Sequence, residues 1–200
     1  MTIRPGAEWG RSIPRPAGLV VAASDVEVTR ALAADPPVPV LAAGGDLART
    51  LGTPPPAGVS TVLELPIDLI EVVVDAGRRL ACAHVVARAP RSRGGWWRGP
   101  VIAVMNAQFL GDWDVAPRGH PNDGRVEVVE GDRSLTVRER LAIRTRLPTG
   151  TFSPHHKVVQ RSVREHHWQL DPPLALWIDG RPAGRTRSLT VRVLPDAAIV

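Results

Sequence analysis

Short apolar runs bounded by turn residues follow one another along most of the chain. Residues 61–75 and 78–89 are rich in apolar and β-branched side chains and are separated by Asp75-Ala76-Gly77, which predicts a β-hairpin. Further strand-like runs occupy residues 99–110, 124–132, 156–170, 174–180 and 188–195. So many short strands predict a β-sandwich or another β-layered domain.

One segment within this series is typical of a helix. In residues 134–147 the apolar side chains recur loosely at helical spacing, and Ser134 is a suitable N-cap residue. We therefore expect one helix among the strands of the C-terminal part.

The first fifty residues follow a different pattern. Apolar runs at 17–25 and 38–46 each end in small residues and an Asp, which is typical of buried strands followed by turns. Residues 26–36 predict a helix, and residues 47–52 predict a second short helix that Gly52 ends. This order makes one βαβ unit, which is too little for a doubly wound sheet.

A proline-rich run, residues 52–60, separates the two patterns. Its three consecutive prolines exclude both a helix and a central strand. We therefore expect a reduced α/β fragment over residues 1–58 and a β-sandwich-like domain over residues 59–200. The predicted fold class is α+β, mostly β.

Composition narrows the class of protein. A hydrophobic share of 44% with a mean hydropathy of −0.04 is ordinary for a soluble globular chain. No apolar run approaches the length that crosses a bilayer, and the first residues lack the apolar core of a signal peptide, so the default location is cytoplasmic. Cys82 is the single cysteine, which excludes an internal disulfide and predicts a small buried side chain.

The net positive charge comes from scattered arginines and does not indicate a nucleic-acid partner. The net charge is +5, yet of the 25 basic residues only Lys157 is a lysine, and the arginines are scattered without a long basic run. We therefore expect no nucleic-acid partner. An anionic membrane surface, with a peripheral location, stays compatible with this charge.

One loop combines aromatic and basic residues. Trp96 and Trp97 lie among Arg91, Arg93 and Arg98, a combination suited to a membrane interface. A surface loop with one Trp packed into the core explains the same residues. Both interpretations stay open.

Two adjacent histidine pairs, His155-His156 and His166-His167, raise the question of zinc. Neighbouring residues on a strand point to opposite faces, so each pair offers at most one ligand to a given site. We expect partly exposed strand histidines instead.

The stretch 111–129 is the most unusual in composition. Asp123-Gly124 is a strong turn pair in front of a predicted strand. A carboxylate in a loop shaped by Gly and Pro would also suit a hard cation such as Mg²⁺. On local evidence the simple turn is favoured.

Four segments together resemble the diacylglycerol kinase and sphingosine kinase superfamily. The segment 101–129 is similar to the core of its second domain, and residues 40–52, 66–72 and 178–182 are similar to three further family stretches in the family's order. In the segment 101–129 the matching residues are Asn106, Gly111, Ala116, Pro117, Pro121, Asp123, Gly124, Val128 and Val129.

The resemblance implies transfer of the ATP γ-phosphoryl group to a lipid hydroxyl, with ATP and Mg²⁺ as cofactors. It places Asp179 as the catalytic base and Asp123 with Asp68 at the metal. The residues that the resemblance places at the nucleotide are Asp25, Gly44, Gly45 and Asp46.

Several positions depart from the family pattern, among them Ala42, Ala43 and Gly45, which stand where the family has Gly, Thr and Asn. Val26 and Glu27 stand where the family's phosphate loop has Gly and Thr, and Arg181 stands where a Glu follows the proposed base. A β-branched residue hinders a phosphate-binding turn, and a carboxylate repels phosphate. The alternative function is therefore a catalytically inactive pseudokinase that binds lipid, a membrane or a protein. A second version has another polypeptide, or a second copy, completing the nucleotide site.

Overall fold

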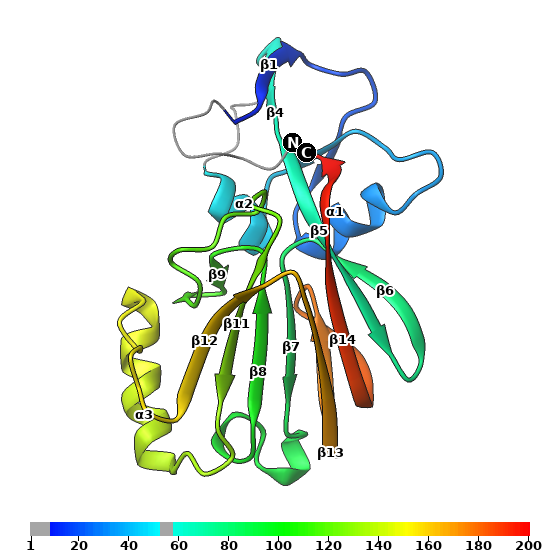
Figure 1. Cartoon of the computed structure of the whole chain (residues 1–200). Helices are drawn as coiled ribbons and strands as arrows, with labels where there is room; N and C mark the ends of the chain where they lie inside the picture. The colour runs from blue at the N-terminus through cyan, green and yellow to red at the C-terminus, as the bar shows by residue number, and fades with distance from the viewer. Residues whose placement is uncertain (1–8, 53–57) are drawn as a thin grey trace.

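The computed structural model describes residues 9–52 and 58–200, and its centre is one eight-stranded antiparallel sheet (Figure 1). Across the sheet the strands are β12 (Val158–Val163), β11 (Val126–Gly131), β8 (Val101–Met105), β7 (His84–Arg88), β13 (Glu165–Ile178), β14 (Arg181–Ile199), β5 (Pro66–Val74) and β6 (Gly77–Ala81). The α+β, mostly-β fold class is confirmed.

The sheet folds back on itself through its two long strands. The second half of β13 pairs with both β7 and β14, whereas its first half pairs with β14 alone. The register of the β13–β14 pairing shifts between Gln169 and Leu174. In that first half Trp168 donates from Nε1 to Glu130 Oε1 on β11, 2.7 Å away, although β7 and β8 separate these strands within the sheet. The sheet therefore closes into two layers, as the sandwich prediction requires.

The main core lies between these layers. Alternate residues of each strand point inward, so the core is made of aliphatic side chains from both layers, with Trp168 at its edge. Its fully or almost fully buried members include Ile70, Val72, Val85, Val104, Val126, Val128, Leu176, Leu189 and Val191.

The N-terminal part forms the predicted βαβ unit. β2 (Val20–Ala22) and β3 (Val40–Ala42) make a parallel pair, and α1 (Asp25–Leu32) and α2 (Gly45–Leu51) follow them at one end of the large sheet (Figure 1). This unit shares a core with the sheet, where Val28 and Leu47 pack with Ile67 and Ala83. The boundary at residue 58 stays a prediction, and most of the proline-rich run lies outside the described residues.

Several local predictions differ from the structure. The break predicted between residues 170 and 174 is absent, because β13 runs through it. Residues 78–89 form two strands, β6 and β7, rather than one. The strand is interrupted at Cys82 and Ala83 because their backbone N–H groups donate to the carboxylate of Asp179. Residues 99–110 contain β8 and then β9 (Phe109–Leu110), which pairs with β10 (Trp113–Asp114). Near the start of the chain, β1 (Arg11–Pro14) pairs with β4 (Thr61–Glu64), a pairing that the proline-rich sequence did not predict.

The predicted C-terminal helix is α3 (Val137–Arg146), which lies beside β12 (Figure 1). Its N-cap is Thr136, not Ser134, because Thr136 and Glu139 form a capping box. Bonds from Lys157 and from Thr136 lower the pKa of Glu139 to about 2.

Single-turn helices η1 (Arg91–Arg93), η2 (Gly95–Trp97) and η3 (Leu147–Thr149) complete the described elements. Within the described ranges, no helix combines the length and the apolar character needed to cross a bilayer.

Candidate functional site

Asp179, the predicted base, lies in the β13–β14 turn with φ 47° and is buried. Its Oδ1 accepts from the backbone N–H groups of Ala83 (3.0 Å) and His84 (3.1 Å). Its Oδ2 accepts from the N–H of Cys82 (3.1 Å) and from Thr29 Oγ1 (2.7 Å). The carboxylate thus joins α1, the β6–β7 break and the β13–β14 turn.

These four bonds constrain what Asp179 can do. A general base must lie within hydrogen-bond reach of the hydroxyl that it deprotonates. Here both carboxylate oxygens are directed at protein donors, and the neighbouring Arg181 is exposed at the start of β14. The arrangement gives Asp179 a structural role that requires no substrate.

Asp25 holds the start of α2. Its carboxylate accepts from the N–H groups of Asp46 (2.9 Å) and Leu47 (3.0 Å), the first amides of that helix. Burial raises the pKa of Asp25, and these two bonds oppose the rise. The side chain takes the position at which an anion would bind α2.

The two glycines of this turn are required by close packing. A Cβ at Gly45, whose φ is +94°, would lie 2.4 Å from Asp25 Oδ1, and a Cβ at Gly44 would lie 2.4 Å from Ala23 O. Gly44 and Gly45 therefore bring the β3–α2 turn against the β2–α1 turn. In that contact the Asp25 carboxylate takes two amides at the start of α2, those of Asp46 and Leu47.

His84 and Asp46 form a buried pair that the sequence did not predict. His84 Nε2 lies 2.8 Å from Asp46 Oδ2, and Asp46 Oδ1 accepts from the N–H of Gly111 (2.9 Å). Burial alone would lower the pKa of His84, but the bond to Asp46 and the charges of Asp179, Asp46 and Asp25 outweigh it, so the pKa is raised.

Asp25, Asp46 and His84 have ligand atoms within 4.8 Å of one another. Mg²⁺ prefers oxygen ligands in an octahedral arrangement, and here the imidazole is bonded to a carboxylate of the same group. His84 Nε2 and the carboxylates of Asp25 and Asp46 already bond to protein atoms, whereas His84 Nδ1 is buried without a hydrogen-bond partner among the described residues.

Replacing His84 with Gln should therefore remove a pH-dependent part of the stability. A histidine in the unfolded chain has a pKa of about 6.5. Because the folded pKa is raised, the stabilisation is complete below that pH and is lost as the pH rises through the folded value. We expect His84→Gln to lower the free energy of unfolding by about 2 kcal/mol in mildly acidic buffer and by clearly less in alkaline buffer.

Urea denaturation across pH measures this difference. His167→Gln is the matched control, since His167 lies exposed on β13. A deficit of His84→Gln that does not change with pH would contradict the charged pair.

Asp68 and Asp123, the predicted metal ligands, lie in a second cluster. The fully buried Asp68 accepts from the N–H of Gly124 (2.6 Å) and of Asp196 (2.9 Å), whereas Asp123 Oδ1 accepts from the N–H of Arg125 (2.9 Å). Burial raises the pKa of both carboxyls, and for Asp68 the two amides oppose the rise. Asp123-Gly124 is thus a turn held by protein hydrogen bonds.

Asn106 connects the two clusters. Its Nδ2 donates to the carbonyls of Asp68 (2.9 Å) and Cys82 (2.8 Å), joining β5 to the β6–β7 break. The structure therefore brings together Asp25, Gly44, Gly45, Asp46 and Asp179 in the first cluster, and Asp68 with Asp123 in the second. The catalytic, nucleotide and metal roles of these residues stay predictions.

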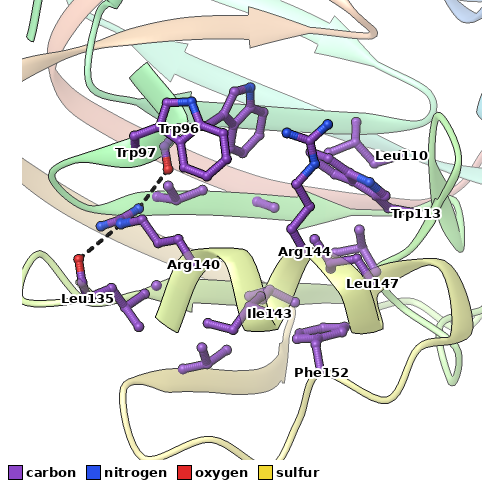
Figure 2. A pocket seen from close by; sticks show the side chains of 16 residues that line it. Trp96, Trp97, Leu110, Trp113, Leu135, Arg140, Ile143, Arg144, Leu147 and Phe152 are labelled. Atoms are coloured by element: carbon purple, nitrogen blue, oxygen red, sulfur yellow. Dashed lines mark hydrogen bonds between the residues drawn. The ribbon is translucent and has the colours of Figure 1, made fainter. Parts of the chain in front are cut away.

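A pocket of about 170 Å³ lies elsewhere, between α3, η2 and the outer face of β8 and β11 (Figure 2). Its walls are mostly apolar, and the lining side chains labelled in Figure 2 are Trp96, Trp97, Leu110, Trp113, Leu135, Arg140, Ile143, Arg144, Leu147 and Phe152.

Arg140 fixes α3 over this pocket. Although buried, it donates to the carbonyls of Leu135 (3.1 Å), Trp96 (3.0 Å) and Gly99. Trp96 packs edge-on against Trp113, with ring centroids 5.5 Å apart. One Trp of the loop is therefore packed inward, as one interpretation predicts, while Trp97 keeps 37% of its surface exposed.

The histidine pairs are partly as predicted. His166 and His167 lie on β13, where they contact Arg161 and Thr190. His155 and His156 precede β12 in a turn, with their rings stacked 4.7 Å apart, so the strand prediction was wrong for this pair.

Comparison with known proteins identifies the fold. No protein-family model matches the sequence, and no curated protein matches it significantly. Three solved structures named as a diacylglycerol kinase from Bacillus anthracis str. Sterne are similar in fold. They have TM-scores of 0.61, 0.63 and 0.63, at 12%, 13% and 12% identity. The matches cover 91%, 90% and 91% of this chain and 77%, 75% and 75% of those chains.

The chain has a diacylglycerol kinase-like fold, and the resemblance read from four segments is confirmed at that level. Kinases in general use ATP and a metal ion. At this identity the likeness concerns the fold and does not extend to the reaction.

Proposed function

We propose that this chain is a lipid-binding relative of diacylglycerol kinases that does not itself transfer phosphate. The observation that carries the proposal is the apolar pocket under α3. Apolar cavities of about 150 Å³ take up a benzene ring. A pocket of about 170 Å³ therefore suits a segment of one acyl chain.

The first cluster supports the absence of phosphoryl transfer. Asp25 occupies the amides of α2, and Asp179 has both oxygens directed at protein donors. A triphosphate placed there would also face the carboxylates of Asp25, Asp46 and Asp179. Its charge would then be opposed rather than stabilised, which is the reverse of what phosphoryl transfer requires.

Lipid kinase activity is the second candidate function. It is favoured by the position of Asp25, Asp46 and Asp179 in one cluster, where the resemblance expects nucleotide and base. It would require Asp25 and Asp179 to give up their present partners.

Intrinsic fluorescence tests lipid binding, since Trp96, Trp97 and Trp113 line the pocket. Titration with dioctanoylglycerol below its micellar range should change the emission and saturate. Ala103→Phe places a ring in the pocket and should weaken binding at least about tenfold, the loss of more than about 1.4 kcal/mol of buried apolar contact. Ala142→Phe, on the exposed side of α3, is the matched control.

A radiolabelled assay with Mg²⁺-ATP and the same diacylglycerol tests catalysis. We expect no labelled lipid. Labelled phosphatidic acid that disappears in Asp179→Asn would establish the kinase, and unaltered fluorescence on titration would overturn the lipid-binding proposal.

A further inference from the structure

We infer that one flank of α3 and the adjacent Trp97 form a docking surface for an anionic membrane, onto which the pocket opens. This docking surface consists of Trp97, Arg98, Val137, Arg138, Leu141 and Arg144. The inference rests on the proposed function, because it names the source from which the pocket would take its lipid.

The apolar part of the docking surface is exposed to solvent. Val137 and Leu141 keep 50% and 48% of their surface exposed, and they lie one turn apart on the same side of α3. A helix of a globular protein normally turns such a stripe toward the core. Here Arg140 and Ile143 form the core side of α3 instead, and Leu147 at the start of η3 continues it.

Trp97 continues this stripe. The guanidinium of Arg144 lies 5.7 Å from the centroid of the Trp97 ring. Arg144 and Trp97 both line the pocket (Figure 2). Because Arg144 is one turn beyond Leu141 on α3, the stripe lies next to the pocket. An exposed indole beside a cation suits the depth of lipid headgroups.

The exposed charged side chains of the docking surface are all positive. Arg138 and Arg144 are exposed on α3, and Arg98 is exposed directly after Trp97 in the chain. Glu139 is the single acid of α3, and it points to the opposite flank, where it binds Lys157 at 2.9 Å and closes the capping box. Each cation close to an anionic bilayer strengthens binding to it. Cations combined with exposed apolar side chains therefore favour an anionic lipid surface as the occupant.

Sedimentation with vesicles tests this surface. The chain should bind vesicles of phosphatidylcholine with phosphatidylglycerol, bind those of phosphatidylcholine alone far more weakly, and dissociate as salt shortens the Debye length. Leu141→Glu should weaken partitioning at least about tenfold, since it adds a charge that both the lipid chains and the anionic headgroups oppose. The matched control is Val159→Glu, which changes a residue of β12 that is 49% exposed outside the docking surface.

Two results would overturn the inference. One is equal partitioning of Leu141→Glu and the unmodified chain. The other result is a dimer, seen by light scattering, that dissociates in the Leu141→Glu variant. The stripe would then be an interface between two copies of the chain.

Failure of the proposed function can be distinguished from failure of the docking inference. Leu141→Glu should still bind dioctanoylglycerol in solution, whereas Ala103→Phe should still sediment with anionic vesicles. If the chain sediments through the docking surface but never binds the soluble lipid, the docking inference stands and the pocket proposal falls.

Discussion

Replacing Asp179 with Ala is expected to cost at least about 3 kcal/mol of unfolding free energy, because each buried donor left without a partner costs about 1–3 kcal/mol. Three backbone N–H groups and the hydroxyl of Thr29 lose their acceptor together. These donors belong to elements far apart in sequence, so the packing of α1 against the β6–β7 break should loosen as well. Chemical denaturation followed by circular dichroism measures the change.

Two variants separate this structural role from catalysis. Thr29→Val removes one of the four bonds and should cost about 1 kcal/mol. Asp179→Asn retains one acceptor oxygen and should fall between the two. If Asp179→Ala unfolds like the unmodified chain and only a phosphoryl-transfer activity is lost, Asp179 is a catalytic base and the structural role is disproved.

The helices and most strands could be predicted because their signals are local. The β5–β6 hairpin follows from apolar runs flanking a turn, and α1 and α2 follow from short helical stretches ended by turn residues. The break at Cys82 could not be predicted. It arises from hydrogen bonds to Asp179, almost a hundred positions away in the chain.

The candidate site was predictable as a set of residues but not as a set of contacts. The resemblance assigned Asp25 and Asp46 to the nucleotide and Asp179 to the base, and the structure has these three residues in one cluster. It carried no signal for His84, a lone histidine within an apolar strand, where a satisfied core residue is the ordinary expectation. Whether an aspartate faces a substrate or a backbone amide depends on the surrounding fold.

The pocket could not be predicted from the sequence for a different reason. The apolar pattern of α3 is weak because Arg140 occupies a buried position while Val137 and Leu141 are exposed. Arg140 is tolerated there because carbonyls of the preceding loops accept its hydrogens. A helix with this inverted pattern cannot be oriented from sequence, so neither the pocket nor the docking surface could be derived.

Asp68→Ala is expected to cost at least about 2 kcal/mol, since two buried amides, those of Gly124 and Asp196, lose their acceptor. Asp123→Ala should cost about 1 kcal/mol or less, because Asp123 is only half-buried and its bond from the N–H of Arg125 lies at the exposed surface. A metal centre predicts a different order, in which removal of either ligand abolishes the ion's contribution to stability.

Thermal unfolding with and without millimolar Mg²⁺ decides between these two expectations. An ion bound to the folded state alone raises the melting temperature by mass action. We expect no shift for the unmodified chain, because the oxygens of Asp68 already accept backbone hydrogens. A Mg²⁺-dependent rise that Asp123→Ala removes would show that the turn holds an ion, as the resemblance implies. Such a result would also reopen the kinase as the function of this fold.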